Sequence, residues 1–262
     1  MMPMNPYLLI ALLLWAFLTL IWAIAQIIKN NSIIDIVYGT TYILAVITSL
    51  FISQNFVSRT ILISSLVIVW GARLSIYLLM RNWGKPEDYR YQEFRKNWGN
   101  HQMLFSYFKV FILQGAIVYA ICFPVIYINL TSTAEVIGIQ EIIGLVIWII
   151  GFYFESVGDA QLKSFKSKPE NKGKVMNQGL WKYTRHPNYF GETTMWWGIY
   201  IIASADPQAI FTIFSPILIT FLLLKVSGVT MLEKKYKGSP EYIDYQKRTS
   251  AFFPWKPKKP SE

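Results

Sequence analysis

The sequence is poor in the groups that build metal sites and soluble domains. Its 262 residues include one cysteine, Cys122, and two histidines, His101 and His186. A single cysteine excludes a disulfide within the chain, and so few ligands exclude a cysteine-based or histidine-rich metal site. Only 15% of the residues are charged, whereas a soluble domain has about 25%. The composition therefore predicts a membrane protein that holds no metal.

Several nucleotide-binding and hydrolase motifs are also absent. There is no G-x-G-x-x-G after a strand pattern and no G-x-x-x-x-G-K-[ST], so soluble-type dinucleotide and P-loop sites are unsupported. H-E-x-x-H and G-x-S-x-G are missing too, which argues against zinc-protease and esterase sites. The net charge of +10 is explained first by membrane orientation, so no nucleic-acid partner is expected.

What the sequence does contain is long apolar runs. Hydrophobic residues make up 53% of the chain, and several runs reach the length of about twenty residues that crosses a bilayer. The runs are continuous rather than alternating, which favours helices over a barrel. We therefore predict an all-α, polytopic membrane protein, a single integral domain with about seven transmembrane helices. The predicted spans are 7–28, 33–53, 60–80, 107–129, 137–158, 189–204 and 208–228.

Basic residues are distributed unevenly between these spans. With the N-terminus outside, 23 of the 25 lysines and arginines lie on the inner side, and only Arg59 and Arg73 do not. This split satisfies the positive-inside rule and favours an odd number of spans. The C-terminus and the basic loops are then cytoplasmic. The loops at 81–106 and 230–250 are expected to carry short surface helices.

A few polar side chains lie in or beside the predicted spans, where a charge is costly unless it is paired or binds a ligand. Asp35 near the start of a span is either a helix N-terminal acid or a functional group. Arg73 lies too deep in the third span to reach the outer surface easily, so it either forms an ion pair or contacts a ligand.

Two acids and two bases mark the end of the fifth predicted span. Glu155 and Asp159 are four residues apart and share a helix face, which Lys163 continues and Lys166 approaches. Acids can hold ribose hydroxyls and bases can hold phosphates. A salt-bridge network would show the same pattern.

The most informative segment is 179–192, GLWKYTRHPNYFGE. Arg185 offers a bidentate fork for phosphate, and the following proline suits the first turn of a helix whose free N–H groups favour an anion. His186 is either a proton donor or a hydrogen-bonding scaffold. Asn188 and Glu192 are four apart and face one way. The segment predicts a site where a polar ligand meets the membrane.

An aromatic and basic cluster follows the last predicted span. Tyr236, Tyr242 and Tyr245 lie near Lys247 and Arg248. The cluster either stacks an adenine and binds phosphate, or forms an interfacial aromatic belt with no ligand.

These residues resemble a known family. Segments 179–183 and 185–192 closely resemble the C-terminal signature of the steroid 5-alpha-reductase and sterol reductase superfamily. Segments 87–91, 168–174 and 232–255 are similar to a mostly bacterial branch of it, often known only as a domain of unknown function. The resemblance implies a seven-span fold in a bacterial inner membrane, with NADPH held on the cytoplasmic side. It also implies hydride transfer to a C=C bond conjugated with a carbonyl in an apolar, steroid- or isoprenoid-like substrate.

The resemblance assigns substrate-side helices to 1–130 and the cofactor-binding half to 131–262. In the steroid reductases an acid and a tyrosine polarise the substrate carbonyl. Here Trp70 stands where that tyrosine is expected, and the second span has no Gln-Glu pair, so the acid and the tyrosine are sought elsewhere. The predicted catalytic residues are Asp35, Tyr38 (with Tyr42 nearby) and Arg73. The predicted cofactor-binding residues are Glu155, Asp159, Lys163, Lys166, Arg185, His186, Asn188, Tyr189, Glu192, Tyr236 and Tyr242.

Two other functions fit the same residues. The isoprenylcysteine methyltransferases share the Arg-His-Pro turn and bind S-adenosylmethionine, which has no phosphates. The many bases between Lys163 and Arg185 favour a phosphorylated ligand instead. A lipid-binding or transport protein without enzymatic activity is the third hypothesis. In each case the expected partners are a hydrophobic small molecule and membrane lipid.

Overall fold

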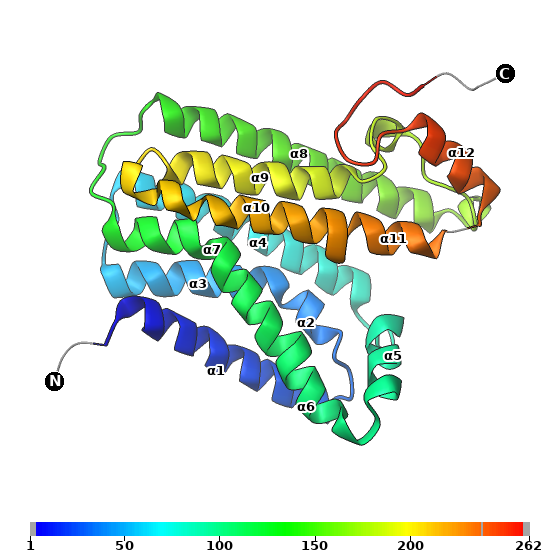
Figure 1. Ribbon diagram of the computed structural model, residues 1–262, viewed down its shortest axis with the longest axis horizontal. Coiled ribbons are helices and arrows are strands. Elements are labelled where there is room, and N and C mark those ends of the chain that lie inside the picture. The colour runs from blue at the N-terminus through cyan, green and yellow to red at the C-terminus, as the bar shows by residue number, and fades with distance from the viewer. Residues whose placement is uncertain (1–3, 237, 259–262) are drawn as a thin grey trace. The chain divides into compact units, whose positions relative to one another are not determined.

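The computed structural model describes residues 4–236 and 238–258, and these form helices and turns without a β-strand. The chain divides into two compact units, Met1–Ile137 and Gly138–Glu262. The helices of the first unit are α1 (Pro6–Ile27), α2 (Ile33–Ile36), α3 (Tyr38–Ser53), α4 (Ser58–Asn82), α5 (Tyr89–Trp98), α6 (Gln102–Ser106) and α7 (Leu113–Thr131), with a π-helical turn Tyr107–Ile112 (Figure 1). Those of the second unit are α8 (Ile139–Ser167), α9 (Pro187–Ala203), α10 (Phe214–Phe221), a π-helical turn Leu222–Val226, α11 (Val229–Lys235) and α12 (Pro240–Arg248).

Five helical segments are long and apolar enough to cross a membrane: Pro6–Ile27, Ser58–Asn82, Tyr89–Thr131, Ile139–Ser167 and Pro207–Lys234. They confirm the predicted all-helical integral membrane protein. The other two predicted spans are shorter than the roughly twenty residues that cross a bilayer. The predicted span 33–53 is interrupted at Val37, so only the 16-residue α3 remains of it. The predicted span 189–204 corresponds to the 17-residue α9.

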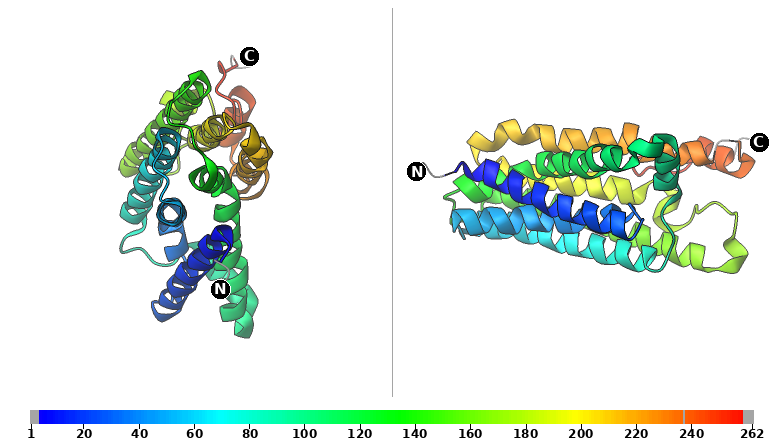
Figure 2. Two further views of the ribbon diagram at one scale, coloured as in Figure 1. Left: turned by 90° about the vertical axis from the view of Figure 1, so that its left-hand side faces the viewer. Right: turned by 90° about the horizontal axis from the view of Figure 1, so that it is seen from below.

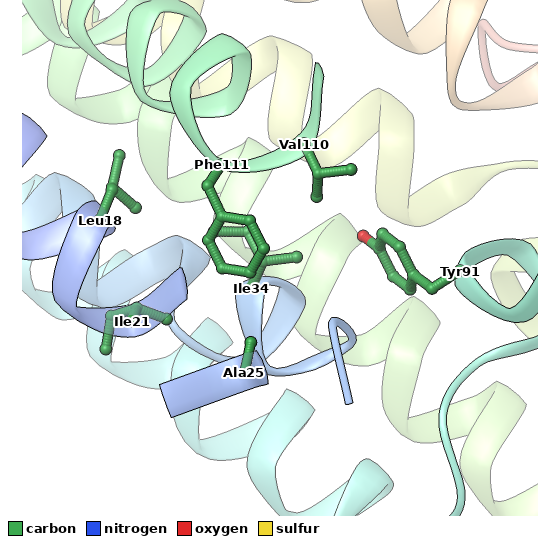
Figure 3. Packing of buried hydrophobic residues seen from close by; sticks show 7 residues of the cluster. All are labelled: Leu18, Ile21, Ala25, Ile34, Tyr91, Val110 and Phe111. Carbon is green, nitrogen blue, oxygen red and sulfur yellow. The ribbon is translucent and has the colours of Figure 1, made fainter. Parts of the chain in front are cut away.

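In the first unit, α1, α3 and α4 run along one direction, while α5 lies across their end (Figures 1 and 2). Helices α3 and α4 pack closely through glycine, since a Cβ added to Gly71 would lie 2.8 Å from the carbonyl oxygen of Gly39. An apolar cluster joins α1 and α2 to α5 and the turn before α7 (Figure 3). Its members are Leu18, Ile21, Ala25, Ile34, Tyr91, Val110 and Phe111.

A buried polar triad also links three helices of this unit. The Asn129 amide of α7 donates to Ser49 Oγ of α3 at 2.9 Å and accepts from Ser64 Oγ of α4 at 3.1 Å. All three side chains are buried. Interhelical hydrogen bonds of this kind stabilise helix association where no hydrophobic driving force acts.

Replacing the central residue of the triad should loosen this unit. Asn129→Ala removes both hydrogen bonds and should lower the free energy of unfolding by about 2 kcal/mol, about 1 kcal/mol for each bond. Thermal unfolding in detergent measures the change. Thr131→Ala is the control, because the Thr131 hydroxyl donates to the Tyr127 carbonyl of its own helix and, within residues 4–236 and 238–258, to no other helix. Equal stability of the two variants would contradict an interhelical role for the triad.

The second unit is built around two antiparallel helices, α8 and α9, with α10 beside α9 (Figure 1). Glycines recur every seven residues along both: Gly144, Gly151 and Gly158 on α8, and Gly191 and Gly198 on α9. A Cβ added to Gly151 would lie 2.6 Å from the carbonyl oxygen of Gly191, and one added to Gly198 would lie 2.7 Å from that of Gly144. The glycines therefore let the two backbones touch and fix which faces meet.

Candidate functional site

The glycine contact places the predicted acids and amides on one side of the α8–α9 pair. An α-helix turns about 100° per residue, so Glu155, Ser156 and Asp159 lie to one side of the contact line on α8. On α9, Asn188 and Glu192 lie to the corresponding side, and because the helices are antiparallel this is the same side of the pair. We call this surface the polar flank. It comprises Glu155, Ser156, Asp159, Asn188 and Glu192, and we include the adjacent Thr193, which lies further round α9 and faces away from α8.

Three side chains of the polar flank are buried, while Ser156, Asn188 and Glu192 are partly buried. Glu155 is 3% exposed, Asp159 5% and Thr193 4%. The Asn188 side-chain N–H donates to Asp159 Oδ1 at 3.3 Å and joins the two helices. The pairing of Glu155 with Asp159 and of Asn188 with Glu192 follows from helical spacing, and the Asn188–Asp159 hydrogen bond brings the two faces together.

Three polar atoms of the flank are shielded from solvent without a hydrogen-bond partner among the described residues. They are Ser156 Oγ, Asn188 Oδ1 and Thr193 Oγ1. Burying such a group without a partner costs about 1–3 kcal/mol, and native proteins rarely leave several together. Ordered water or a bound polar molecule would satisfy these three atoms.

Next to the flank, Arg185 connects the start of α9 to α11 and α12. Its Nε donates to Glu233 Oε1 at 2.7 Å, and its Nη1 donates to the carbonyl oxygens of Gln246 at 3.1 Å and Thr249 at 2.5 Å. Gln246 Nε2 donates to the second oxygen of Glu233 at 2.9 Å. The Arg185 guanidinium therefore donates to acceptors within the protein, whereas the sequence suggested that it would bind a phosphate in a bidentate manner.

His186 shares the same acid. Its Nε2 lies 3.2 Å from Glu233 Oε1, and its ring stacks on Tyr189 with centroids 5.5 Å apart. The imidazole is 3% exposed, and Nδ1 is buried without a partner among the described residues. We call Arg185, His186, Glu233 and Gln246 the Glu233 cluster.

The C-terminal segment wraps around the turn before α9. A parallel bridge pairs Thr184 with Ser250, and the Arg185 N–H donates to the Ser250 carbonyl at 2.9 Å. The Tyr245 hydroxyl donates to the carbonyl of Trp181, whose indole N–H donates to the Gly158 carbonyl of α8 at 3.0 Å. These bonds fix the 179–186 turn from both sides.

The predicted aromatic and basic groups lie at the rim of this unit. Tyr236 and Tyr242 stack on each other at 4.6 Å, so one face of each ring is already covered. Burial raises the pKa of Tyr242 to about 12, and the nearby charge of Glu233 acts in the same direction. Lys163 and Lys166 extend from α8 with exposed side chains.

The three predicted catalytic residues belong to the first unit, where each has a different partner. Asp35 accepts from Arg90 Nη2 at 2.8 Å and from the Tyr91 hydroxyl at 2.7 Å. These bonds hold α5 against α2. Burial raises the pKa of the neighbouring Asp88, but the hydrogen bonds and charge of Arg90 outweigh it and leave that pKa below its ordinary value.

Tyr38 and Arg73 lie in an aromatic part of the same unit. The Tyr38 hydroxyl shares a hydrogen bond of 2.9 Å with that of Tyr42, and the buried Tyr42 ring packs edge-on against Trp70 at 5.0 Å. The Arg73 guanidinium lies over the Tyr77 ring at 5.3 Å. The Tyr38–Tyr42 pair is thus a phenolic hydrogen-bonding group inside the first unit.

Sequence reasoning missed four members of these groups: Ser156, Thr193, Glu233 and Gln246. Helical phase could have found Ser156, which directly follows Glu155, but a lone hydroxyl gives little signal. A partly buried arginine needs an acidic partner, but residues 230–250 contain several acids, and the sequence does not show which one pairs with Arg185. Only the path of the chain selects Glu233.

Comparison with known proteins gives relatives without a described activity. A family model described as "Protein of unknown function (DUF1295)" matches residues 21–249. The uncharacterized protein C594.04c of Schizosaccharomyces pombe (strain 972) is 26% identical over 281 residues, covering 95% of this chain and 80% of the relative. No solved structure matches the chain.

Proposed function

We propose that this chain, which belongs to the DUF1295 family, is a membrane-embedded reductase that uses NADPH to transfer hydride to a C=C bond conjugated with a carbonyl in an apolar, steroid- or isoprenoid-like substrate. The observation that carries the proposal is the polar flank, where Ser156, Asn188 and Thr193 hold buried atoms without partners among the described residues. A ligand rich in hydroxyl and amide groups satisfies such atoms.

The residues around the flank fit NADPH chemically. The carboxylates of Glu155 and Asp159 suit ribose hydroxyls, and the exposed Lys163 and Lys166 further along α8 suit phosphates. Arg185 positions the turn before α9, since its guanidinium already has three acceptors. When bound, NADPH supplies the hydride, and the protein contributes binding, orientation and exclusion of water.

The substrate side of the proposal belongs to the first unit. Of the predicted catalytic residues, Asp35 is occupied by Arg90 and Tyr91. Phenolic hydroxyls and a guanidinium are hydrogen-bond donors, so we propose that the Tyr38–Tyr42 pair, with Arg73, donates to the carbonyl oxygen as enolate charge develops. A cavity of about 300 Å³ in the same unit suits an apolar ligand, but Tyr38, Tyr42 and Arg73 are not among the residues that line it. It is lined by Leu14, Trp15, Leu18, Ile112, Gly115 and Tyr119, among others.

The proposal includes a membrane arrangement. We propose that α3 and α9 also cross the membrane, so that together with the five long apolar segments they make seven spans in a bacterial inner membrane. The basic loops and the C-terminus then face the cytoplasm, where NADPH is present. The orientation can be measured by labelling single cysteines introduced in a Cys122→Ser background. We expect a cysteine at Lys174 to be labelled only from the cytoplasmic side and a cysteine at Val136 only from outside.

The choice of cofactor can be tested directly by titrating the detergent-purified protein with NADPH and, separately, with S-adenosylmethionine. We expect NADPH alone to raise the unfolding temperature, because ligand that binds only the native state stabilises it. A shift with S-adenosylmethionine alone would instead support the methyltransferase. A shift with neither would favour the lipid-binding or transport protein.

Two adjacent threonines provide a matched test of the polar flank. Thr193→Val keeps the shape but removes the unpaired hydroxyl, so it should stabilise the ligand-free protein by about 1 kcal/mol and weaken NADPH binding about fivefold. Thr194→Val is the control, because the Thr194 hydroxyl is bonded to the Phe190 carbonyl of its own helix. Unfolding curves and fluorescence titration measure the two effects. Unchanged NADPH affinity in Thr193→Val would remove the flank from the binding site.

A further inference from the structure

The imidazole of His186 has two nitrogens in different situations. Nε2 contacts Glu233 Oε1 at 3.2 Å, whereas Nδ1 is buried with no partner among the described residues. The ring stacks on Tyr189. By helical phase, Tyr189 lies about 100° from Asn188 and about 40° from Thr193, on the part of α9 that faces away from the glycine contact. The unpaired nitrogen therefore belongs to the turn that begins α9.

The hydrogen-bond pattern of the Glu233 cluster decides which nitrogen carries the proton. Arg185 is always protonated and lies 2.7 Å from Glu233, so Glu233 is an ionised carboxylate that can only accept. His186 Nε2 must then be the donor, and it carries the hydrogen. In a neutral imidazole one nitrogen carries the hydrogen and the other is an acceptor. Nδ1 is therefore a lone-pair acceptor.

We propose that His186 Nδ1 accepts a hydrogen bond from a neutral N–H or O–H group of the bound ligand, with Glu233 fixing the tautomer. The inference rests on the proposed function and adds an orientation to it. NADPH offers such donors as its carboxamide N–H₂ and its ribose hydroxyls. A phosphate is an acceptor and cannot pair with this nitrogen. The adenine N–H₂ is a donor too, so the proposal assigns the nicotinamide–ribose end to the turn before α9 and the adenosine end is the alternative that the 2′,5′-ADP titration tests. The phosphates then lie toward Lys163 and Lys166.

Two substitutions separate the roles of the two nitrogens. A glutamine amide reaches the position of Nε2, and an asparagine amide reaches the position of Nδ1. His186→Gln keeps the contact with Glu233 and loses the acceptor. His186→Asn keeps an acceptor and loses the contact with Glu233. Both variants of the full chain are titrated with NADPH and with 2′,5′-ADP, which contains the phosphates of one end but no nicotinamide.

We expect His186→Gln to unfold at the wild-type temperature, to bind NADPH about tenfold more weakly, and to bind 2′,5′-ADP as the wild type does. His186→Asn should unfold at a lower temperature and bind NADPH more tightly than His186→Gln. Wild-type NADPH affinity in His186→Gln, or an equal loss for both ligands, would overturn the inference. Failure of the wild-type protein to bind NADPH would overturn the proposed function itself, which is a separate outcome.

Discussion

The Gly191→Ala variant should lose about 3 kcal/mol of stability or fail to accumulate in the membrane. A Cβ at this position would lie 2.5 Å from the carbonyl oxygen of Gly151 and 2.9 Å from the Cβ of Glu155. Both obstacles are backbone or are attached directly to it, so no side-chain rotation relieves them. The helices must separate, which also pulls Asn188 away from Asp159. Unfolding in a denaturing detergent titration measures the loss.

Gly138→Ala is the matched control for this prediction. A Cβ at Gly138 would meet the end of the Glu141 side chain at 3.1 Å, and although Glu141 is buried and accepts from the Gly138 N–H, its carboxylate needs to shift only slightly. Its cost should therefore stay below about 0.5 kcal/mol. If Gly191→Ala were as stable as Gly138→Ala, the close approach of α8 and α9 would be wrong, and the polar flank would lose its geometric basis.

Arg185→Ala should release the C-terminal segment from the turn before α9. The substitution leaves Glu233 as a partly buried charge and removes the donor from the carbonyls of Gln246 and Thr249. Removing one partner of a buried ion pair costs about 3–5 kcal/mol. We expect a large drop in unfolding temperature and rapid proteolytic cleavage between residues 238 and 258. Mass spectrometry of the digested protein identifies the cleavage sites.

Two further arginine variants sharpen this prediction. Arg248→Ala breaks an exposed pair with Asp244 and should cost less than about 1 kcal/mol. Arg185→Lys keeps the charge but cannot donate in the three directions that the guanidinium serves, so it should rescue only part of the loss. Full rescue by lysine would mean that charge alone matters at this position. Equal protease resistance of Arg185→Ala and the wild type would mean that Arg185 does not hold the segment.

Arg185 shows that a sequence motif predicts where a side chain lies better than it predicts which group that side chain binds. The motif around Arg185 correctly marks the start of a helix and the neighbourhood of a polar cluster. The fork that it suggests for phosphate is directed at Glu233, 48 residues away in the chain. Likewise Tyr236 and Tyr242, for which the sequence left open adenine stacking or an interfacial belt, stack on each other. Residue type predicts what a side chain can bind but not which of several suitable partners it meets.

The sequence by itself determined that the chain is a helical membrane protein and which residues share a helix face. Apolar runs in lipid must satisfy their own backbone hydrogen bonds, and the spacing of residues four apart is a local property of the helix. The tertiary structure alone decided that the glycines of α8 and α9 meet, which brings two separate faces together as the polar flank. It also chose Glu233 as the shared partner of Arg185 and His186. Both outcomes depend on contacts between residues far apart in the chain, which local spacing does not encode.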